Sequence, residues 1–502
     1  MSEQIIDDQM LLFDKYLERT HMDKKQYQYD GVKWCLTNEL RQGIRGGFIA
    51  DEMGLGKTIM MIGTMVCNYL KKTLIILPPI LIDQWFLQIY RTTGHKAIIY
   101  HGINKKKITI DMLNDATIVI TSYGAITMTK KQLKAGDTSI LHKIHWSRIV
   151  FDEAHHLRNA NTCWKSAKLL SGDIRWLVSG TPIQNRKRDF YNLCSILKLP
   201  SGFYTNSENL IKLAQLYILK RTKTQVGIQI PDVVIDKDIV DWSNKREMEL
   251  SEEIHSALAF SNVSGVKGSS MVRMLGDKGI LSLLLRARQS CILPRLLVPA
   301  LAKLIQVGII DSADKYKEAL KSTSKLDSVI RKILENKDNG NGKIVFCHFK
   351  EEIDEIAGRL REGGINKIAI FDGRISGGKR HDILNDKNDV LILQIQTGCE
   401  GLNLQENYSE IYFVSPHWNP AVEEQAIARC HRIGQKKEVT VNRFEMSNFV
   451  KDIDQEIETR SVDNYVNMVQ DNKKKIICDI IKVYFVIICI IFWMKRESIY
   501  LI

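Results

Sequence analysis

Short runs of apolar, mostly β-branched residues alternate with stretches of helical period, and this alternation occurs twice along the chain. The runs are Gly47–Ala50, Thr73–Leu77, Thr117–Thr121, Arg148–Phe151 and Trp176–Ser179 in the first half, and Lys343–Phe346, Lys367–Phe371, Val390–Ile395 and Glu410–Val414 in the second. Continuous apolar strands separated by helices are typical of parallel sheets with helices on both faces. Because 502 residues are also too many for one core, we predict an α/β fold with two tandem parallel-sheet domains.

The stretch between the two halves has a mainly helical period that is broken by glycine and serine at NVSGVKGSS (262–270). We interpret this stretch as a helical insertion and linker between the sheet domains. The predicted parts are an N-terminal tail (1–20), a first sheet domain (21–200), the insertion (201–320), a second sheet domain (321–470) that ends in the helical stretch Asp452–Gln470, and a C-terminal tail (471–502).

The C-terminal tail contains a mostly apolar segment, IICDIIKVYFVIICIIFWM (476–494). Its uncharged part, Val483–Met494, has twelve residues, which is fewer than the roughly 20 that span a bilayer. Asp479 and Lys482 would each cost about 2.5–3.5 kcal/mol near the bilayer centre. A buried terminal helix, or a tail without a functional role, therefore fits better than a membrane anchor.

The formal net charge of +13 favours a polyanionic partner, with nucleic acid ahead of an acidic membrane surface. The ten cysteines are scattered singly and form no CxxC pair. This spacing argues against zinc ribbons, RING modules and redox dithiols. It also indicates a reducing, intracellular compartment.

The sequence FIADEMGLGKTIMM (48–61) places a glycine-rich turn between a strand and a helix. In a phosphate-binding loop, backbone N–H groups of such a turn point at the phosphates, a lysine pairs with the β/γ oxygens and a hydroxyl holds Mg²⁺. Gly54, Gly56, Lys57 and Thr58 supply these groups, and a helix that begins near Lys57 directs the positive end of its dipole at the anion. Asp51 stands where the general motif has its first glycine.

The stretch RIVFDEAHH supplies carboxylates at the end of a later apolar strand. Asp152 would hold the metal, directly or through water, and Glu153 would polarise the attacking water. Two charged residues that cap the next helix are the simpler alternative. The order of a phosphate loop first and DEAH after a later strand favours the nucleotide site.

The stretch QAIARCHRIGQ (425–435) can bring two guanidinium groups to the γ-phosphate from outside the first domain. On a continuous helix, Gln425, Arg429 and Arg432 follow the i, i+4, i+7 spacing of one face. Arginine fingers of this kind stabilise charge in the transition state. A basic, solvated helix face is the alternative for the isolated stretch.

Taken in this order, these elements resemble the helicase-like ATPases of superfamily two, in particular the SWI/SNF-type DNA translocases. The motifs that carry the resemblance are KKQYQYDGVKW (24–34), DEMGLGKT (51–58), LPPILIDQW (77–85), ITSYG (120–124), DEAH (152–155), SGTPIQN (179–185), LKRTKTQV (219–226), LLLRARQSCILPRLL (283–297), KIVFCHF (343–349), TGCEGLNL (397–404), WNP (418–420) and QAIARCHRIGQ (425–435). The combination is specific, although each motif alone is weak.

The resemblance implies two tandem RecA-like parallel-sheet domains that bind ATP and Mg²⁺ between them. Thr58 and Asp152 would hold the metal, and Glu153, Arg429 and Arg432 would be catalytic. The nucleotide-binding residues it implies are Gln28 as the adenine reader, Asp51, Glu52, Met53, Gly54, Leu55, Gly56, Lys57, Thr58, Asp152 and Gln425. In the family's own motif, an aspartate at the position of Asp51 is normal.

The resemblance also implies nucleic-acid contacts at Ser122, Tyr123, Thr397, Gly398 and Trp418. Ser122 and Tyr123 can alternatively cap a strand end, and Trp418 can pack between the lobes. His155 and Thr181 would couple the DEAH turn to the SGTPIQN motif. Two departures, Cys399 for a second glycine and Ser415 for an aspartate before WNP, put coupling in doubt more than nucleotide binding.

The function predicted from this resemblance is an ATP-dependent translocase that moves on double-stranded DNA and remodels or displaces bound proteins. A strand-separating DNA or RNA helicase of the same superfamily is the first alternative. A nucleotide-switched nucleic-acid clamp with little turnover is the second. The expected partners are duplex DNA and a targeting protein rather than a membrane, in a nucleus or another DNA-containing compartment, a viral one included.

Overall fold

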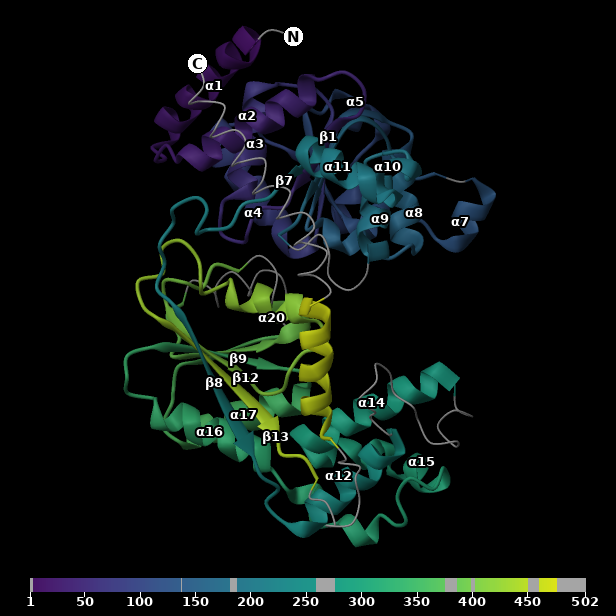
Figure 1. Ribbon diagram of the computed structural model, residues 1–502, viewed down its shortest axis with the longest axis vertical. Helices are drawn as coiled ribbons and strands as arrows, with labels where there is room; N and C mark the ends of the chain where they lie inside the picture. Colours follow the sequence, from purple (N-terminus) through teal and green to yellow (C-terminus); the bar gives the residue numbers. More distant parts are fainter. Residues whose placement is uncertain are drawn as a thin grey trace. The chain divides into compact units, whose positions relative to one another are not determined.

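The computed structural model describes residues 3–136, 138–180, 187–258, 276–374, 386–398, 402–449 and 460–475. The chain divides into two compact units, the first extending to Gln229 and the second from Ile230 to Lys474. Each unit contains a parallel sheet flanked by helices (Figure 1).

The described strands of the first unit form a seven-stranded parallel sheet with the order β3-β4-β2-β5-β6-β1-β7. Its strands are β1 (Arg45–Ile49), β2 (Thr73–Leu77), β3 (Ile98–Tyr100), β4 (Ile118–Ser122), β5 (His145–Asp152), β6 (Ser171–Val178) and β7 (Ile218–Leu219). Successive residues of β2 enter different core clusters: Ile75 and Leu77 pack on one face, and Leu74 and Ile76 on the other. Both faces of the sheet are therefore buried, as in other parallel sheets.

Helices cover both faces of the first sheet. The helices that share a core with Ile75 and Leu77 are α1 (Glu3–Thr20), α2 (Gln26–Leu40), α3 (Lys57–Cys67) and α4 (Ile82–Thr93). Those that share a core with Leu74 and Ile76 are α5 (Ile110–Asp115), α6 (Tyr123–Ile126), α8 (Thr162–Leu169), α9 (Lys187–Ile196), α10 (Ser201–Thr205) and α11 (Leu210–Tyr217). The short α7 (Lys130–Ala135) buries none of its side chains.

The described strands of the second unit form a six-stranded parallel sheet with the order β10-β11-β9-β12-β13-β8. Its strands are β8 (Val233–Val240), β9 (Gly342–Cys347), β10 (Ile368–Phe371), β11 (Val390–Gln394), β12 (Tyr408–Phe413) and β13 (Val439–Met446). The edge strand β8 pairs with β13 along its full length, from Val233 with Val439 to Val240 with Met446.

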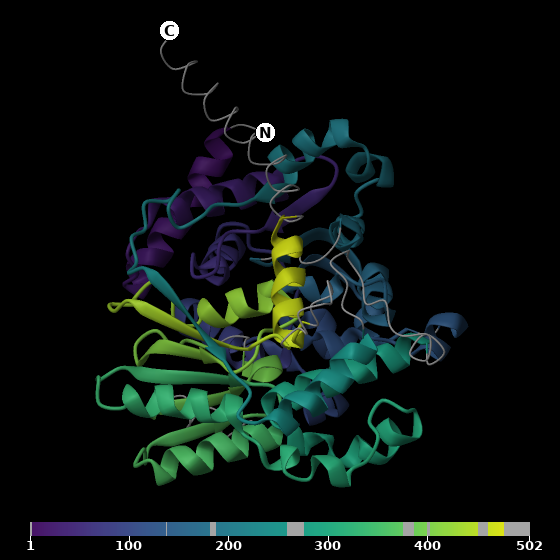
Figure 2. The same cartoon turned by 60° about the horizontal axis from the view of Figure 1, so that its bottom comes forward.

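Most described helices of the second unit share one core with its sheet. They are α12 (Lys245–Leu258), α14 (Gly276–Ile292), α15 (Leu301–Gln306), α16 (Ser324–Glu335), α17 (Lys350–Glu362) and a helix over 462–475. The same unit contains α19 (Ile395–Gly398) and α20 (Pro420–Ile427). Leu250 of α12 and Ala287 of α14 belong to the same core cluster as Val345 of β9. In both views the helix over 462–475, drawn in yellow, lies next to α20 (Figures 1 and 2).

The predicted fold class, two tandem parallel-sheet domains with a helical insertion, is confirmed. Four strands lie outside the predicted runs, namely β3, β7, β8 and β13. The change from one unit to the next falls inside 201–320, because α10 and α11 belong to the first unit whereas α12, α14 and α15 belong to the second. Of the predicted terminal stretch Asp452–Gln470, the described part is helical from 462.

Within the described part of the chain, no helix combines the length and the apolar character needed to cross a bilayer. The apolar segment 476–494 and the break at 262–270 lie outside the described residues.

Candidate functional site

The glycine-rich turn follows β1 and leads directly into α3, which begins at Lys57. Gly54 and Gly56 have φ values of 91° and 81°, a left-handed conformation that side chains disfavour. A Cβ on Gly56 would lie 2.4 Å from Nε2 of Gln28. The turn thus needs glycine for its conformation and for close approach, and its N–H groups and the start of α3 form a cradle that suits an anion.

Lys57 lies over this turn. Its Nζ donates hydrogen bonds to the carbonyl oxygens of Asp51 at 2.9 Å and Glu52 at 3.3 Å. A Cβ on Gly180, just after β6, would lie 3.4 Å from the same Nζ. The turn after β1 and the end of β6 therefore converge on the Lys57 ammonium group.

The carboxylates of Asp51 and Glu52 pair with cations of the loop after β7, and the assignment of both residues to nucleotide binding stays a prediction. Asp51 is fully buried and pairs with Arg221, whose Nη2 lies 2.5 Å from Oδ2 and whose Nε lies 3.2 Å from Oδ1. Glu52 accepts hydrogen bonds from the backbone N–H of Lys223 at 2.8 Å and pairs with its Nζ at 3.1 Å. A carboxylate inside a phosphate cradle would repel its ligand, whereas here both acids hold the turn in place.

Sequence reasoning missed Arg221 and Lys223 as site residues. They lie in LKRTKTQV, a segment with three cations that could have been matched to the two adjacent acids of DEMGLGKT. Arg221 also donates from Nη1 to the carbonyl of Tyr27 at 2.5 Å. This arginine therefore ties the loop after β7 to the start of α2 and to the cradle.

Replacing Arg221 with methionine should lower the free energy of unfolding by about 3–5 kcal/mol, because it leaves the buried Asp51 carboxylate without its cation. Urea denaturation of the full chain measures this loss. The double variant Asp51→Asn/Arg221→Met should recover part of it. Lys33→Met, which removes an exposed pair with Asp7, is the control and should cost under about 1 kcal/mol. A loss no larger than that of the control would contradict the prediction.

Gln28, Met53 and Leu55 lie close to the cradle. Nε2 of the buried Gln28 donates to the carbonyl of Leu55 at 3.2 Å. The Met53 side chain lies against Gly180, where a Cβ would be 3.0 Å from its Cγ, and Leu55 is fully buried. Gln28 is thus at the edge of the cradle, and its reading of adenine stays a prediction.

Asp152 ends β5, and the structure surrounds its carboxylate with donors. Oδ2 accepts a hydrogen bond from Nε1 of Trp85 at 2.7 Å, and Oδ1 accepts one from the backbone N–H of Glu153 at 3.0 Å. Burial, followed by the negative charge of Glu153, raises the pKa of Asp152 to about 7. The charge of Lys57 acts in the opposite direction, so the acid and the cradle lysine are close enough to interact. Trp85 ends the motif LPPILIDQW, and sequence reasoning gave it no role.

Replacing Asp152 with asparagine should make the stability of the magnesium-free protein less dependent on pH. An acid whose pKa is raised by folding binds more protons in the folded state, so its contribution is present at low pH and is lost as pH rises toward about 7. Between about pH 5 and pH 8 the wild type should therefore lose stability relative to Asp152→Asn, as measured by urea denaturation. Parallel pH curves for the two proteins would contradict this.

Glu153 has a left-handed backbone, with φ 49° and ψ 48°. This conformation is uncommon outside glycine and, at functional sites, often stores strain. Oε2 of Glu153 lies 3.3 Å from Nδ1 of His155, which also lies 3.3 Å from Oγ of Ser179. His155 thus joins the DEAH turn to the residue that begins SGTPIQN, as expected of a coupling residue. Thr181 lies outside the described residues.

Thr58 supplies a hydroxyl group and Asp152 supplies a carboxylate. Proteins that bind Mg²⁺ together with substrate phosphates use hard oxygen ligands of this kind. Thr58 is on the first turn of α3. Asp152 ends β5, and its carboxyl group interacts electrostatically with Lys57. These donors fit a magnesium ion. Among the described residues no group of three or more His, Cys, Asp or Glu side chains forms a metal site.

Ser122 and Tyr123 are buried, and their assignment as nucleic-acid contacts stays a prediction. Oγ of Ser122 accepts a hydrogen bond from the N–H of Ala125 at 3.3 Å and so caps α6. The hydroxyl of Tyr123 donates to the carbonyl of Asp152 at 2.7 Å, and its ring stacks on that of His156 at 5.1 Å. Tyr123 therefore supports the DEAH turn from behind, because the ends of β4 and β5 are near each other in the sheet.

In the second unit, α20 ends at Ile427, so Arg429 and Arg432 do not continue the helix of Gln425. This corrects the predicted helical face. The carbonyl of Arg429 accepts a hydrogen bond from the N–H of Leu404 at 3.1 Å, and Nη1 of Arg432 donates to Oδ1 of Asn403. The turn keeps a helical bond from the N–H of His431 to the carbonyl of Ile427 at 2.8 Å, and these tertiary bonds are added to it.

The two arginines nevertheless lie close together in the turn over 428–435. Burial, and after it the positive charge of Arg429, lowers the pKa of Arg432. Holding two cations near each other is unfavourable without an anion, which makes this turn a candidate site for phosphate. Gln425 is buried on α20.

Trp418 packs inside the second unit. Its ring meets that of Tyr465 edge-on with centroids 6.2 Å apart, and the guanidinium carbon of Arg288 lies 5.2 Å from its centroid. These contacts favour a packing role over stacking on a base. Thr397 and Gly398 are in α19, but their side chains lie outside the described part, and Cys399 does as well.

Comparisons with known proteins identify similar families and relatives. The model of the SNF2-related domain matches residues 27–296, and that of the helicase conserved C-terminal domain matches 324–434. A probable global transactivator of Orgyia pseudotsugata multicapsid polyhedrosis virus is 30% identical over 474 residues, which cover 89% of each chain. An uncharacterized ATP-dependent helicase of Mycoplasma pneumoniae is 30% identical over 484 residues, but these cover 90% of this chain and only 42% of the relative. A solved SWI2/SNF2 ATPase core of Sulfolobus solfataricus in complex with dsDNA is 24% identical, with a TM-score of 0.38 over 85% of this chain and 88% of that one.

Proposed function

The chain belongs to the SNF2-related family and is an ATP-hydrolysing enzyme of the helicase type, and from this premise we propose that it translocates on duplex DNA. In this proposal, ATP hydrolysis drives movement along the DNA and the remodelling or displacement of bound proteins. A targeting protein or a particular DNA structure would direct the enzyme, because the grip on a phosphate backbone carries little sequence information.

One observation carries the nucleotide half of this proposal. The cradle follows β1, the DEAH turn follows β5 and SGTPIQN begins after β6, and the order β5-β6-β1 makes these three strands neighbours. Ligands of open parallel sheets bind outside the carboxyl ends of the strands. Three segments that are about 25–130 residues apart in sequence thus meet where a triphosphate would bind.

The residues of the first unit would have different roles in ATP binding and hydrolysis. Gly54, Gly56 and Lys57 would hold the phosphates, Thr58 and Asp152 would hold Mg²⁺, and Glu153 would take a proton from the attacking water. The metal, when bound, supplies positive charge that neutralises the phosphate oxygens. That charge also favours ionised Asp152, whose pKa is raised to about 7 by burial in its absence.

Arg429 and Arg432 of the second unit would stabilise charge on the transferred phosphoryl group. Hydrolysis is then fast only when both units contribute to one site, so ATP favours closure and product release permits opening. Alternating closure with a changing grip on the backbone would move the enzyme along one strand.

The partner and the compartment follow from the family and from the charge. The net charge of +13 favours a polyanion. Relatives include an ATP-dependent DNA helicase of Arabidopsis thaliana and the viral transactivator. We therefore expect activity on DNA, in a nucleus or a viral or other DNA-containing compartment.

The test is the ATPase rate of the full chain without nucleic acid and with single-stranded DNA, duplex DNA or RNA. The proposal expects stimulation by duplex DNA and loss of the activity in Lys57→Ala. Stimulation by single-stranded nucleic acid alone would favour a strand-separating helicase. Binding to DNA with no stimulated hydrolysis would favour a nucleotide-switched clamp.

A further inference from the structure

The segment Ser415–Trp418 connects β12 to α20, and side chains from other elements hold all four of its carbonyl groups. We call this segment the 415–418 connector. The donors are Nε2 of His348 to Ser415 at 3.3 Å, Nη2 of Arg288 to Pro416 at 2.8 Å, Nε2 of Gln470 to His417 at 2.5 Å and Nζ of Lys473 to Trp418 at 2.7 Å. Connecting segments commonly leave such groups to solvent, so this degree of engagement is unusual.

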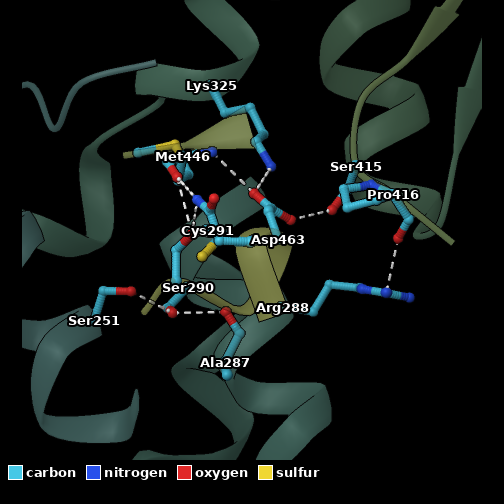
Figure 3. Close-up of polar contacts among 12 residues, drawn as sticks. Ser251, Ala287, Arg288, Ser290, Cys291, Lys325, Ser415, Pro416, Met446 and Asp463 are labelled. Carbon is cyan, nitrogen blue, oxygen red and sulfur yellow. Dashed lines mark hydrogen bonds and ion pairs between the residues drawn. The ribbon is translucent and has the colours of Figure 1, made fainter. Parts of the chain in front are cut away.

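The helix over 462–475 makes two of these four contacts, through Gln470 and Lys473, and adds a third contact to the connector through Asp463. Asp463 and Gln470 are seven residues apart, about two helical turns, and therefore share a face. Oδ1 of Asp463 accepts a hydrogen bond from the hydroxyl of Ser415 at 2.7 Å, and Oδ2 accepts from the N–H of Met446 at 3.0 Å and from Nζ of Lys325. Figure 3 shows this carboxylate between Lys325, Met446 and Ser415.

Arg288 of α14 reaches the connector from the insertion. It is 6% exposed, and its hydrogen bond to the carbonyl of Pro416 is drawn in Figure 3. Among the described residues, its Nε has no hydrogen-bond partner, and no carboxylate lies within ion-pair distance of its guanidinium group. Burying a cation with so few partners is costly. A contribution to stability therefore explains the burial of Arg288 poorly. A role in holding a backbone segment in place explains it specifically.

The connector leads through α20 to the turn over 428–435, which contains Arg429 and Arg432 and which we call the arginine turn. Asn419 accepts a hydrogen bond from the N–H of Ala421 at 3.2 Å and starts α20. Oε1 of Glu423 accepts from the N–H of His417 at 2.7 Å and from Nε2 of Gln470 at 2.8 Å. The start of α20 is therefore fixed to the connector and to the helix over 462–475. Because α20 is only two turns long, an altered start shifts its other end, where the arginines follow.

We propose that Asp463, Gln470 and Arg288 are positioning residues for ATP hydrolysis, which act by holding the 415–418 connector so that Arg429 and Arg432 keep one orientation. The inference rests on the proposed function for its catalytic readout. It adds that α14 of the insertion and the helix over 462–475, to which no role was assigned from the sequence, are part of the ATPase machinery.

The first test is the steady-state ATPase of Gln470→Leu in the full chain. Loss of two hydrogen bonds to the connector and to Glu423 should lower kcat about 10- to 100-fold, as expected for misplaced catalytic groups. The affinity for a fluorescent ATP analogue should stay that of the wild type, because the first unit makes the cradle. Asp471→Asn, an exposed neighbour on the same helix, is the control and should keep wild-type turnover. Unchanged turnover in Gln470→Leu would overturn the proposal.

A double-mutant cycle separates positioning from general stability. If Gln470 acts through the arginine turn, Gln470→Leu should lower kcat in the wild type but not further in Arg429→Ala. Independent losses that multiply would refute this route. At the second position, Arg288→Lys should retain more activity than Arg288→Met, because lysine keeps a charged donor; equal losses would argue for a purely structural role.

Hydrogen exchange provides a readout that does not depend on the proposed function. In Gln470→Leu, amides of α20 and of the turn over 428–435 should exchange faster than in the wild type, while those of β9 and β12 stay protected. If the wild type shows no nucleic-acid-stimulated hydrolysis, the proposed function fails even when this change is seen. If hydrolysis is present but exchange is unchanged, the positioning role fails alone.

Discussion

Replacing Arg429 or Arg432 with alanine is expected to lower the stimulated kcat by about 10³–10⁵-fold, the range in which arginine fingers contribute in other NTPases. The two guanidinium groups lie close enough for Arg429 to lower the pKa of Arg432, although burial is the larger cause. A turn that gathers two cations is suited to an anion with several charged oxygens.

Binding measurements identify the step that these arginines serve. The affinity for an ATP analogue should change little, because the cradle of the first unit makes those contacts. Arg432→Lys should remain impaired, since an ammonium group lacks the planar fork that binds two oxygens at once. Lys436→Ala, an exposed cation in the same connection, is the matched control. Wild-type turnover in both alanine variants would mean that the nucleotide site does not use the second unit.

Replacing Glu153 with glutamine is expected to lower kcat by about 10²–10⁴-fold, the usual contribution of a positioned general base. Glutamine keeps the size of the side chain but cannot accept a proton from water. The left-handed backbone at Glu153, the ion pair with His155 and the link from His155 to Ser179 together set the position of its carboxylate.

Nucleotide and duplex DNA binding should both survive in Glu153→Gln, because the cradle, Asp152 and the positively charged side chains are unchanged. Glu52→Gln is the matched control, since Glu52 has the same chemistry but pairs with Lys223 outside the cradle. It should keep most of the turnover and lose some stability. If Glu52→Gln were the inactive variant and Glu153→Gln the active one, the roles of the two acids would have to be exchanged.

Local sequence carried enough information for the central strands and for the segments that follow them. Strand β2 is a continuous apolar run, and β5 and β9 contain the apolar runs IVF and IVFC, because both faces of a parallel sheet are buried. Two of the strands that were missed do not follow this rule. β8, VVIDKDIV, is an edge strand with exposed charges, and β7 has two residues whose pairing depends on β1.

The helix predicted through Arg432 shows a second limit. Nothing in QAIARCHRI interrupts a helical pattern, since the next glycine is Gly434. The helix ends at Ile427, and Leu404, Asn403 and Pro231 form hydrogen bonds with the turn that follows. Contacts between groups so far apart in sequence cannot be recognised from the local hydrophobic periodicity.

The sequence by itself determined the order of two parallel-sheet domains, the glycine cradle with Lys57 and Thr58, and the acids of the DEAH turn. These depend on backbone conformation and on residue type within a few positions, which local sequence records. Only the tertiary structure decided that Asp51 pairs with Arg221 and that Tyr123 donates a hydrogen bond to the carbonyl of Asp152. It also decided that Arg288 and Gln470 hold the connector before α20. Each of these pairs joins residues that are about 30–170 positions apart, and only the packed chain brings such groups within reach of a hydrogen bond.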